Sequence, residues 1–221
     1  MFIFMSDVLE ADALSSLRAS IDMLDFEAGA SSAGWHARAV KRNRQAVPDA
    51  RLRQIQARIT ASLNSSDVFR AAALPKRIAP PLLARYAPGE EYGLHVDNAV
   101  IGSPPLRSDL SLTLFLSEPK SYEGGELIVD TSGGEEAVKL PAGSAVLYPS
   151  TNLHRVAPVK SGERLAAVTW IESLVRNGED RAILFDLDLA KRRLYESAGK
   201  SEIFDLVAKA HTNLLRRWAE T

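Results

Sequence analysis

Between about residue 77 and residue 172 the sequence alternates between short apolar runs and turn residues. The strand-like runs are 81–86, 92–96, 110–116, 126–129, 136–140, 144–148, 155–159 and 165–172. Glycine- and proline-containing turns such as Pro88-Gly89 and Gly124-Gly125 separate them. Roughly eight strands in about 95 residues predict a double-sheet jelly roll, an arrangement that leaves few exposed sheet edges.

Helical patterns flank this segment on both sides. Apolar residues recur at helical spacing in two early stretches, Leu14, Leu17, Ile21 and Leu24, then Leu52, Ile55, Ile59 and Leu63. After Asn177-Gly178 the pattern is helical again over about 179–196, and a last helix opens near Ser201. We therefore predict an α+β fold, with N-terminal helices packed on a double-stranded β-helix (jelly roll) core and a C-terminal helical tail.

The predicted organisation has three parts. Residues 1–76 form an N-terminal helical and strand support region, residues 77–177 the jelly-roll core, and residues 178–221 a C-terminal helical extension. The extension is too small to fold alone. It either packs on the roll or forms a homo-oligomer interface with another subunit.

Composition excludes several classes of function. The formal net charge is -1, so an overall basic surface for nucleic acid is absent. The sequence has no cysteine, which rules out disulfides, thiolate zinc sites and iron–sulfur clusters. No apolar run approaches the roughly 20 residues that cross a bilayer, and the N-terminus lacks a basic signal-peptide region. We expect a cytoplasmic protein with no nucleic-acid or membrane partner.

His95, Asp97 and His154 form a candidate metal site. Side chains two positions apart on a strand share a face, so His95 and Asp97 can reach one ion. His154 would approach from another strand of the β segment. Two imidazoles and a carboxylate on one face of an octahedral ion are typical of non-haem Fe(II) oxygenases, because this set leaves positions open. His36 and His211 lack such partners, and for them we expect structural or surface roles.

Arg164 follows His154 by ten residues. We interpret 156–159 and 165–170 as an antiparallel hairpin, which sets Arg164 about 10 Å along the strand from the metal ligand. A C5 dicarboxylate chelated at one end would fill that gap, and a guanidinium pairs bidentately with a carboxylate. The alternative is a solvent-exposed arginine in a hairpin.

Two aromatic residues lie near these positions in the predicted strands. Tyr86 precedes His95 by nine residues, and its hydroxyl could donate to the same carboxylate as Arg164. Trp170 has an even spacing from Arg164 and so shares its strand face, where it could line the cavity. Core packing is the competing explanation for both residues.

Several segments resemble a known enzyme family. Residues 85–98, RYAPGEEYGLHVDN, resemble the iron-binding segment of prolyl-4-hydroxylase-type Fe(II)/2-oxoglutarate dioxygenases. The segments LSLTLFLSEP (110–119), YEGGEL (122–127), LPAG (140–143) and LYPS (147–150) resemble the bacterial branch called PKHD-type hydroxylases. The resemblance covers essentially the whole chain.

The resemblance implies an Fe(II)- and 2-oxoglutarate-dependent dioxygenase that uses O2 and releases succinate and CO2. His95, Asp97 and His154 would bind iron, Arg164 with Tyr86 would bind 2-oxoglutarate, and Trp170 and Asn98 would line the pocket. The family is associated with L-ascorbate. The hydroxylated C–H bond would belong to a peptidyl or prolyl substrate, or to a small metabolite.

Two other interpretations use the same triad. Nucleic-acid repair dioxygenases usually carry a second arginine six residues after the first, where this sequence has Trp170. A cupin-like metal-binding sensor or non-redox metalloenzyme would hold Zn, Mn or Ni and would not bind 2-oxoglutarate. A response to 2-oxoglutarate that depends on Arg164 distinguishes the sensor from the oxygenase.

Overall fold

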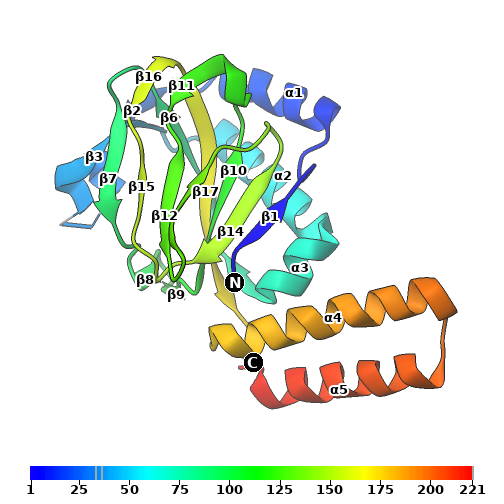
Figure 1. The fold of residues 1–221 in the computed structure, drawn as a ribbon. Coiled ribbons are helices and arrows are strands. Elements are labelled where there is room, and N and C mark those ends of the chain that lie inside the picture. Colours follow the sequence, from blue (N-terminus) through cyan, green and yellow to red (C-terminus); the bar gives the residue numbers. More distant parts are fainter. Residues whose placement is uncertain (33, 36, 221) are drawn as a thin grey trace.

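Two antiparallel sheets form the core of a computed structural model, which describes residues 1–32, 34–35 and 37–220 (Figure 1). The larger sheet has, in spatial order, β1 (Ile3–Met5), β14 (Ala145–Pro149), β10 (Leu110–Phe115), β17 (Arg164–Ser173), β6 (Leu82–Tyr86), β4 (Arg44–Ala46) and β2 (Phe26–Ala28). β5 (Pro75–Ile78) pairs with β17 outside that path. This sheet carries Arg164 and Tyr86.

The smaller sheet carries the two candidate histidine ligands. Its order is β13 (Gly134–Val138), β12 (Leu127–Thr131), β15 (His154–Val156), β7 (Glu91–His95) and β3 (Lys41–Arg42). Two short ribbons complete the roll, β11 (Tyr122–Gly124) with β16 (Val159–Gly162), and β8 (Val100–Ile101) with β9 (Leu106–Arg107).

Strand β10 shows how the sheet separates two environments. Leu110, Leu112 and Leu114 lie in the apolar core between the larger sheet and the helices. The alternate residue Phe115 belongs to the second apolar cluster, inside the roll, and Thr113 lines a cavity there. Because side chains alternate along a strand, every second residue of β10 faces the helices and the residues between them face the interior of the roll.

The helices cover the outer face of the larger sheet. They are α1 (Ala11–Ile21), α2 (Ala50–Ser65) and α3 (Asp67–Ala73), with short 3-10 turns at Gly29–Ser32, Ala37–Val40 and Pro119–Ser121. The Asp49 carboxylate caps α2 by accepting a hydrogen bond from the Leu52 amide at 2.7 Å. Leu17, Ile59 and Leu63 of these helices are fully buried in the core that they share with the sheet.

The C-terminal helices α4 (Gly178–Ala198) and α5 (Glu202–Trp218) form a hairpin that projects from the roll (Figure 1). The Ser201 hydroxyl caps α5, and every residue of α5 keeps some exposure to solvent. Several contacts join the hairpin to the rest of the chain. Leu184 of α4 is fully buried, Arg192 pairs with Asp67 of α3 at 2.7 Å, and Glu220 accepts a hydrogen bond from Arg107 at 2.9 Å. α4 therefore packs against α3 and the apolar core, and Glu220 joins the last part of the tail to β9.

The predicted fold class is confirmed, and each of the eight predicted strand runs contains observed strand. The run 155–159 divides into β15 and β16, on either side of Ala157 and Pro158. β5, β11 and the ribbon of β8 and β9 lay outside the predicted runs.

The predicted hairpin around residues 160–163 is wrong. β16 pairs with β11, whereas β17 lies between β10 and β6 in the larger sheet. The chain crosses from one ribbon to another sheet at Gly162, which has a positive φ of 73°. Arg164 consequently lies opposite Tyr86 and not opposite a residue beyond His154. Strand pairing between distant segments, which no local pattern encodes, determined this outcome.

Leu112→Ala tests the shared core of helices and sheet. The side chain is 1% exposed, so its truncation should lower the free energy of unfolding by about 3 kcal/mol. Urea denaturation measures this loss. Met23→Ala, where the residue is 67% exposed, should change the same quantity by less than about 0.5 kcal/mol. Equal losses in the two variants would contradict the described packing.

Candidate metal and co-substrate site

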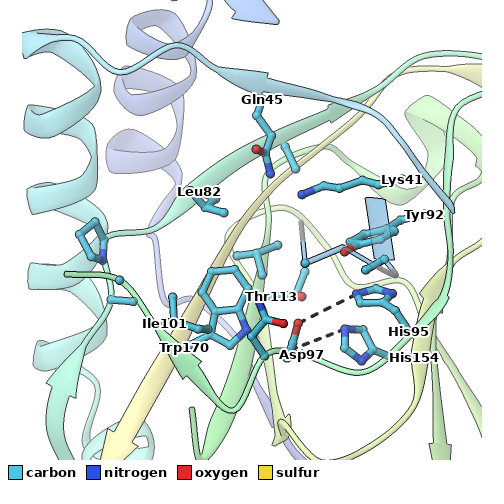
Figure 2. Close-up of a pocket in the computed structure, with 18 of the residues that line it drawn as sticks. Lys41, Gln45, Leu82, Tyr92, His95, Asp97, Ile101, Thr113, His154 and Trp170 are labelled. Carbon is cyan, nitrogen blue, oxygen red and sulfur yellow. Dashed lines mark ion pairs between the residues drawn. The ribbon is translucent and has the colours of Figure 1, made fainter. Parts of the chain in front are cut away.

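A cavity of about 740 Å³ lies inside the roll and receives side chains from both sheets. His95, Asp97 and His154 line one region, and Arg164 and Tyr86 line another. Figure 2 shows the triad at one end of the view, with Lys41 and Tyr92 above it and Trp170 facing it. Ligand pockets typically measure about 300–1,000 Å³, so the cavity has room for more than one small molecule.

Strand pairing brings the triad together. β15 pairs antiparallel with β7, and this register sets His154 directly opposite His95. Asp97 lies two residues beyond the end of β7. The Asp97 carboxylate oxygens are 4.0 Å from His95 Nε2 and 3.7 Å from His154 Nε2. One ligand atom from each residue can be chosen so that all lie within 4.8 Å of one another.

Both imidazoles are oriented by backbone carbonyls. His95 Nδ1 lies 2.8 Å from the Gly93 oxygen, and His154 Nδ1 lies 3.0 Å from the Asn152 oxygen. A carbonyl only accepts hydrogen bonds, so each Nδ1 carries the proton and each Nε2 presents its lone pair. Such contacts fix the tautomer that a metal ligand needs.

The Asp97 carboxylate is fixed by a serine pair. Ser111 Oγ donates to Asp97 Oδ2 at 2.6 Å, and Ser111 and Ser150 share a hydrogen bond of 2.7 Å. Both serines are buried. This contact leaves the other oxygen, Oδ1, available on the side of His95.

Burial keeps the imidazole of His95 neutral. Desolvation, with a smaller effect from neighbouring His154, lowers the pKa of His95 to about 4. At neutral pH its Nε2 is therefore unprotonated and able to bind a cation.

The donor set fits a divalent ion. Ligands at about 2.1 Å from a six-coordinate ion lie about 3 Å apart in adjacent positions, so distances of 3.7 and 4.0 Å need only a small inward movement. Two nitrogens and a carboxylate on one side leave the facing positions open to the cavity.

Arg164 is a buried cation that faces this cavity. Its side chain is 1% exposed, and its Nε and Nη1 atoms have no hydrogen-bond partner in the part of the chain that the structure describes. The guanidinium carbon lies 5.0 Å from the centre of the Tyr86 ring. Gly125, with a positive φ of 67°, makes room for it, since a Cβ there would lie 3.1 Å from Arg164 Cδ.

Tyr86 retains its proton beside this cation. Burial raises the pKa of the phenol, while Arg164 and Asn43 act in the opposite direction. A protonated hydroxyl next to a guanidinium gives a set of hydrogen-bond donors that is suited to a carboxylate.

Comparison with known proteins decides the family. Residues 81–172 match the 2OG-Fe(II) oxygenase superfamily, and residues 179–220 match the PKHD-type hydroxylase C-terminal domain. A PKHD-type hydroxylase of Synechococcus elongatus is 46% identical over 223 aligned positions that cover 100% of both chains. The chain belongs to the PKHD-type hydroxylases. It is therefore an Fe(II)- and 2-oxoglutarate-dependent dioxygenase, as the resemblance implied.

Solved structures share the fold of this hydroxylase. A prolyl hydroxylase from Trichoplax adhaerens, solved with a peptide fragment of hypoxia inducible factor, has a TM-score of 0.60 at 15% identity. The match covers 82% of this chain and 86% of that one. HygX from Streptomyces hygroscopicus, solved with nickel, 2-oxoglutarate and hygromycin B, has a TM-score of 0.56 at 14% identity, covering 79% and 84%. Among the described residues of the hydroxylase, no helix is long and apolar enough to cross a membrane.

Every site residue that the sequence predicted lines the same cavity. Trp170 and Asn98 do so together with the triad, Arg164 and Tyr86. His211 lies in α5, and His36 lies outside the described residues.

Sequence reasoning missed Lys41, Asn43, Tyr92 and Ser111. The ring of Tyr92 stacks on His95 at 3.6 Å, and Lys41 Nζ lies 5.0 Å from the centre of the Tyr92 ring. Burial lowers the pKa of Lys41 to about 8, which keeps it mostly charged at neutral pH. Ser111 alternates with the leucines of β10, and this period of two could have predicted that its side chain faces the interior of the roll.

Ser111→Ala tests the support of Asp97, a candidate metal ligand, in this hydroxylase. The variant removes the donor to Asp97 Oδ2, so its affinity for Mn(II) should fall by about 10- to 100-fold. Calorimetric titration of the metal-free protein measures it. Ser197→Ala, an exposed serine in α4, is the matched control and should bind Mn(II) like the unchanged protein. Unaltered affinity in the Ser111 variant would show that the carboxylate needs no such support.

Proposed function

We propose that His95, Asp97 and His154 hold the Fe(II), and that Arg164 and Tyr86 bind the distal carboxylate of 2-oxoglutarate. The observation that carries this proposal is the buried guanidinium of Arg164, which lines the same cavity as the triad. None of the ion pairs found among the described residues includes Arg164. A buried charge without a counter-ion is costly, so an anionic ligand in the cavity is strongly favoured.

The charges at the two ends of the cavity, the triad and Arg164, match those of 2-oxoglutarate. The metal end would take the keto-acid group, since the triad leaves coordination positions open on one side. The other end offers a cation and the protonated Tyr86 hydroxyl to the second carboxylate. A neutral ligand or a single carboxylate would leave one end unmatched.

When bound, Fe(II) supplies the oxidising chemistry that couples O2 and 2-oxoglutarate to C–H hydroxylation, with release of succinate and CO2. The residues of this chain orient the participants. Gly93 and Asn152 fix the imidazoles, Ser111 fixes Asp97, and Arg164 sets the direction of the co-substrate. Trp170 and Asn98 line the part of the cavity where the organic substrate would lie.

The organic substrate belongs to one of two classes, a peptidyl or prolyl group or a small metabolite. The Trichoplax neighbour was solved with a peptide and HygX with hygromycin B, so both classes fit this fold. Incubation with proline-containing peptides and with metabolite extracts, followed by mass spectrometry for a gain of one oxygen, separates the classes.

Two further parts of the proposal concern the surroundings of the enzyme. L-Ascorbate would sustain repeated turnover, as the family resemblance implies, and it should raise the number of turnovers before inactivation. A cytoplasmic location agrees with a sequence that has no cysteine and so needs no oxidising compartment.

We also propose that the C-terminal hairpin mediates homo-oligomerisation. Ile203 and Leu206 of α5 are 62% and 59% exposed, and Tyr195 of α4 is 57% exposed. Light scattering should then report a mass above that of one chain, and Ile203→Glu with Leu206→Glu should return it to the monomer value. A monomeric mass for the unchanged protein at high micromolar concentration would contradict this part.

Arg164→Leu and His154→Ala test the proposed site. His154→Ala should abolish succinate formation, because the metal loses a ligand. Arg164→Leu should raise the KM for 2-oxoglutarate by about 30-fold or more, because the distal carboxylate loses its counter-ion. The readout is succinate released from 2-oxoglutarate.

Arg216→Leu, on exposed α5, serves as the arginine control and should behave like the unchanged enzyme. Succinate formation that persists in His154→Ala would refute the metal site. An unchanged KM in Arg164→Leu would refute the assignment of the carboxylate.

A further inference from the structure

One segment of the chain joins the two sheets across the cavity. β3 pairs with β7 in the smaller sheet, and β4, which begins two residues after β3 ends, pairs with β6 in the larger sheet. We call residues 41–46 the crossing segment. Lys41, Asn43 and Gln45 alternate along it and all line the cavity. Figure 2 shows the Lys41 and Gln45 side chains extending toward the space between the triad and Leu82.

Asn43 is the most deeply buried polar residue of the crossing segment that lacks a partner. The residue is 5% exposed, and neither Nδ2 nor Oδ1 has a partner at full hydrogen-bond geometry within the described residues. Its contact with the Tyr86 hydroxyl, which lowers the pKa of that phenol, falls short of this geometry. Burying an amide without partners is unfavourable, and native proteins keep such groups rare. A ligand in the cavity is one way to satisfy it.

The position of Asn43 is tightly held. Its backbone oxygen accepts a hydrogen bond from the Gly29 amide at 2.8 Å. The side chain occupies the space where another residue at position 29 would have a Cβ, which would lie 2.2 Å from Asn43 Oδ1. The backbone of Asn43 is therefore held by the Gly29 amide, and its side-chain amide fits beside position 29 because that residue is a glycine.

Asn43 shares its surroundings with the groups that face the distal carboxylate. The pKa of the Tyr86 phenol is lowered by Arg164 and by Asn43, although burial raises it overall. Arg164 pairs with Tyr86 in the register of β17 and β6. Asn43 and Arg164 therefore both act on one hydroxyl, and both carry buried polar atoms without partners.

We propose that Asn43 is a third binding residue for the distal carboxylate of 2-oxoglutarate, donating from Nδ2 beside the guanidinium of Arg164. This inference rests on the proposed function of the site. A carboxylate has about four lone-pair positions, more than one guanidinium fills, so an amide and a phenol can complete its coordination. The amide adds a directed hydrogen bond without adding a second cation to the buried end.

The experiment measures binding of 2-oxoglutarate to the Mn(II)-loaded protein by calorimetry, which does not depend on turnover. Asn43→Leu should weaken binding by about tenfold or more, because a hydrogen bond to a charged group is lost. Binding of 2-oxobutyrate, which has the keto-acid end but no distal carboxylate, should be unchanged in the same variant. Asn64→Leu, an exposed asparagine at the end of α2, is the control.

Gly29→Ala gives a second test that leaves Asn43 in place. The new methyl group should displace the amide, so it should weaken 2-oxoglutarate binding in the same ligand-selective way. Gly133→Ala, where the nearest atom to a new Cβ is 3.8 Å away, is the matched control. Thermal unfolding shows whether the Asn43→Leu and Gly29→Ala variants fold. If only one of them folds, its 2-oxoglutarate binding decides the role of Asn43.

The outcomes distinguish a failure of the proposed function from a failure of the role of Asn43. If the unchanged protein fails to bind 2-oxoglutarate, the proposed function fails and this inference falls with it. If the unchanged protein binds it and the folded Asn43→Leu or Gly29→Ala variant binds equally well, only the role of Asn43 is refuted. An equal loss for 2-oxoglutarate and 2-oxobutyrate would also refute it, because the effect would then not concern the distal carboxylate.

Discussion

The interior of the roll is the constraint on which the rest of the structure depends. It encloses imidazoles, a carboxylate and a guanidinium where little water can reach them, so each polar group needs a partner from the protein or from a ligand. Backbone carbonyls satisfy the Nδ1 atoms of His95 and His154, and Ser111 satisfies one oxygen of Asp97. The buried atoms of Arg164 and Asn43 that lack partners are the basis of the proposed co-substrate contacts.

The sequence predicted local secondary structure better than the pairing of distant strands. Local periodicity predicted the strands and helices well, because alternation on a strand follows directly from backbone geometry. The proximity of His95 and Asp97 could be predicted because they are two residues apart, although Asp97 lies beyond the end of β7 and not on the strand. The partner of Arg164 could not, because strand pairing joins residues 78 positions apart, Tyr86 and Arg164. Such pairing depends on the whole topology and not on neighbouring residues.

Asn43 and Lys41 illustrate a second limit of sequence reasoning. Lysine and asparagine are usually exposed, so the alternation at 41, 43 and 45 resembles an ordinary surface strand. The side chains become internal only because the segment crosses between two sheets that close over it. The region expected to support the core, residues 1–76, thereby contributes directly to the cavity, although the oxygenase family match covers only residues 81–172.

The anchor of the C-terminal hairpin has a consequence for how the enzyme could evolve. Arg107 bonds Glu220 near the end of the chain and also Asp109, and it terminates the β8–β9 ribbon, whose Ile101 and Leu106 line the cavity. One side chain thus connects the family-specific tail to a ribbon that lines the cavity. Substitutions in the tail can therefore act on the wall of the cavity through Arg107, without any exchange of the residues that line it.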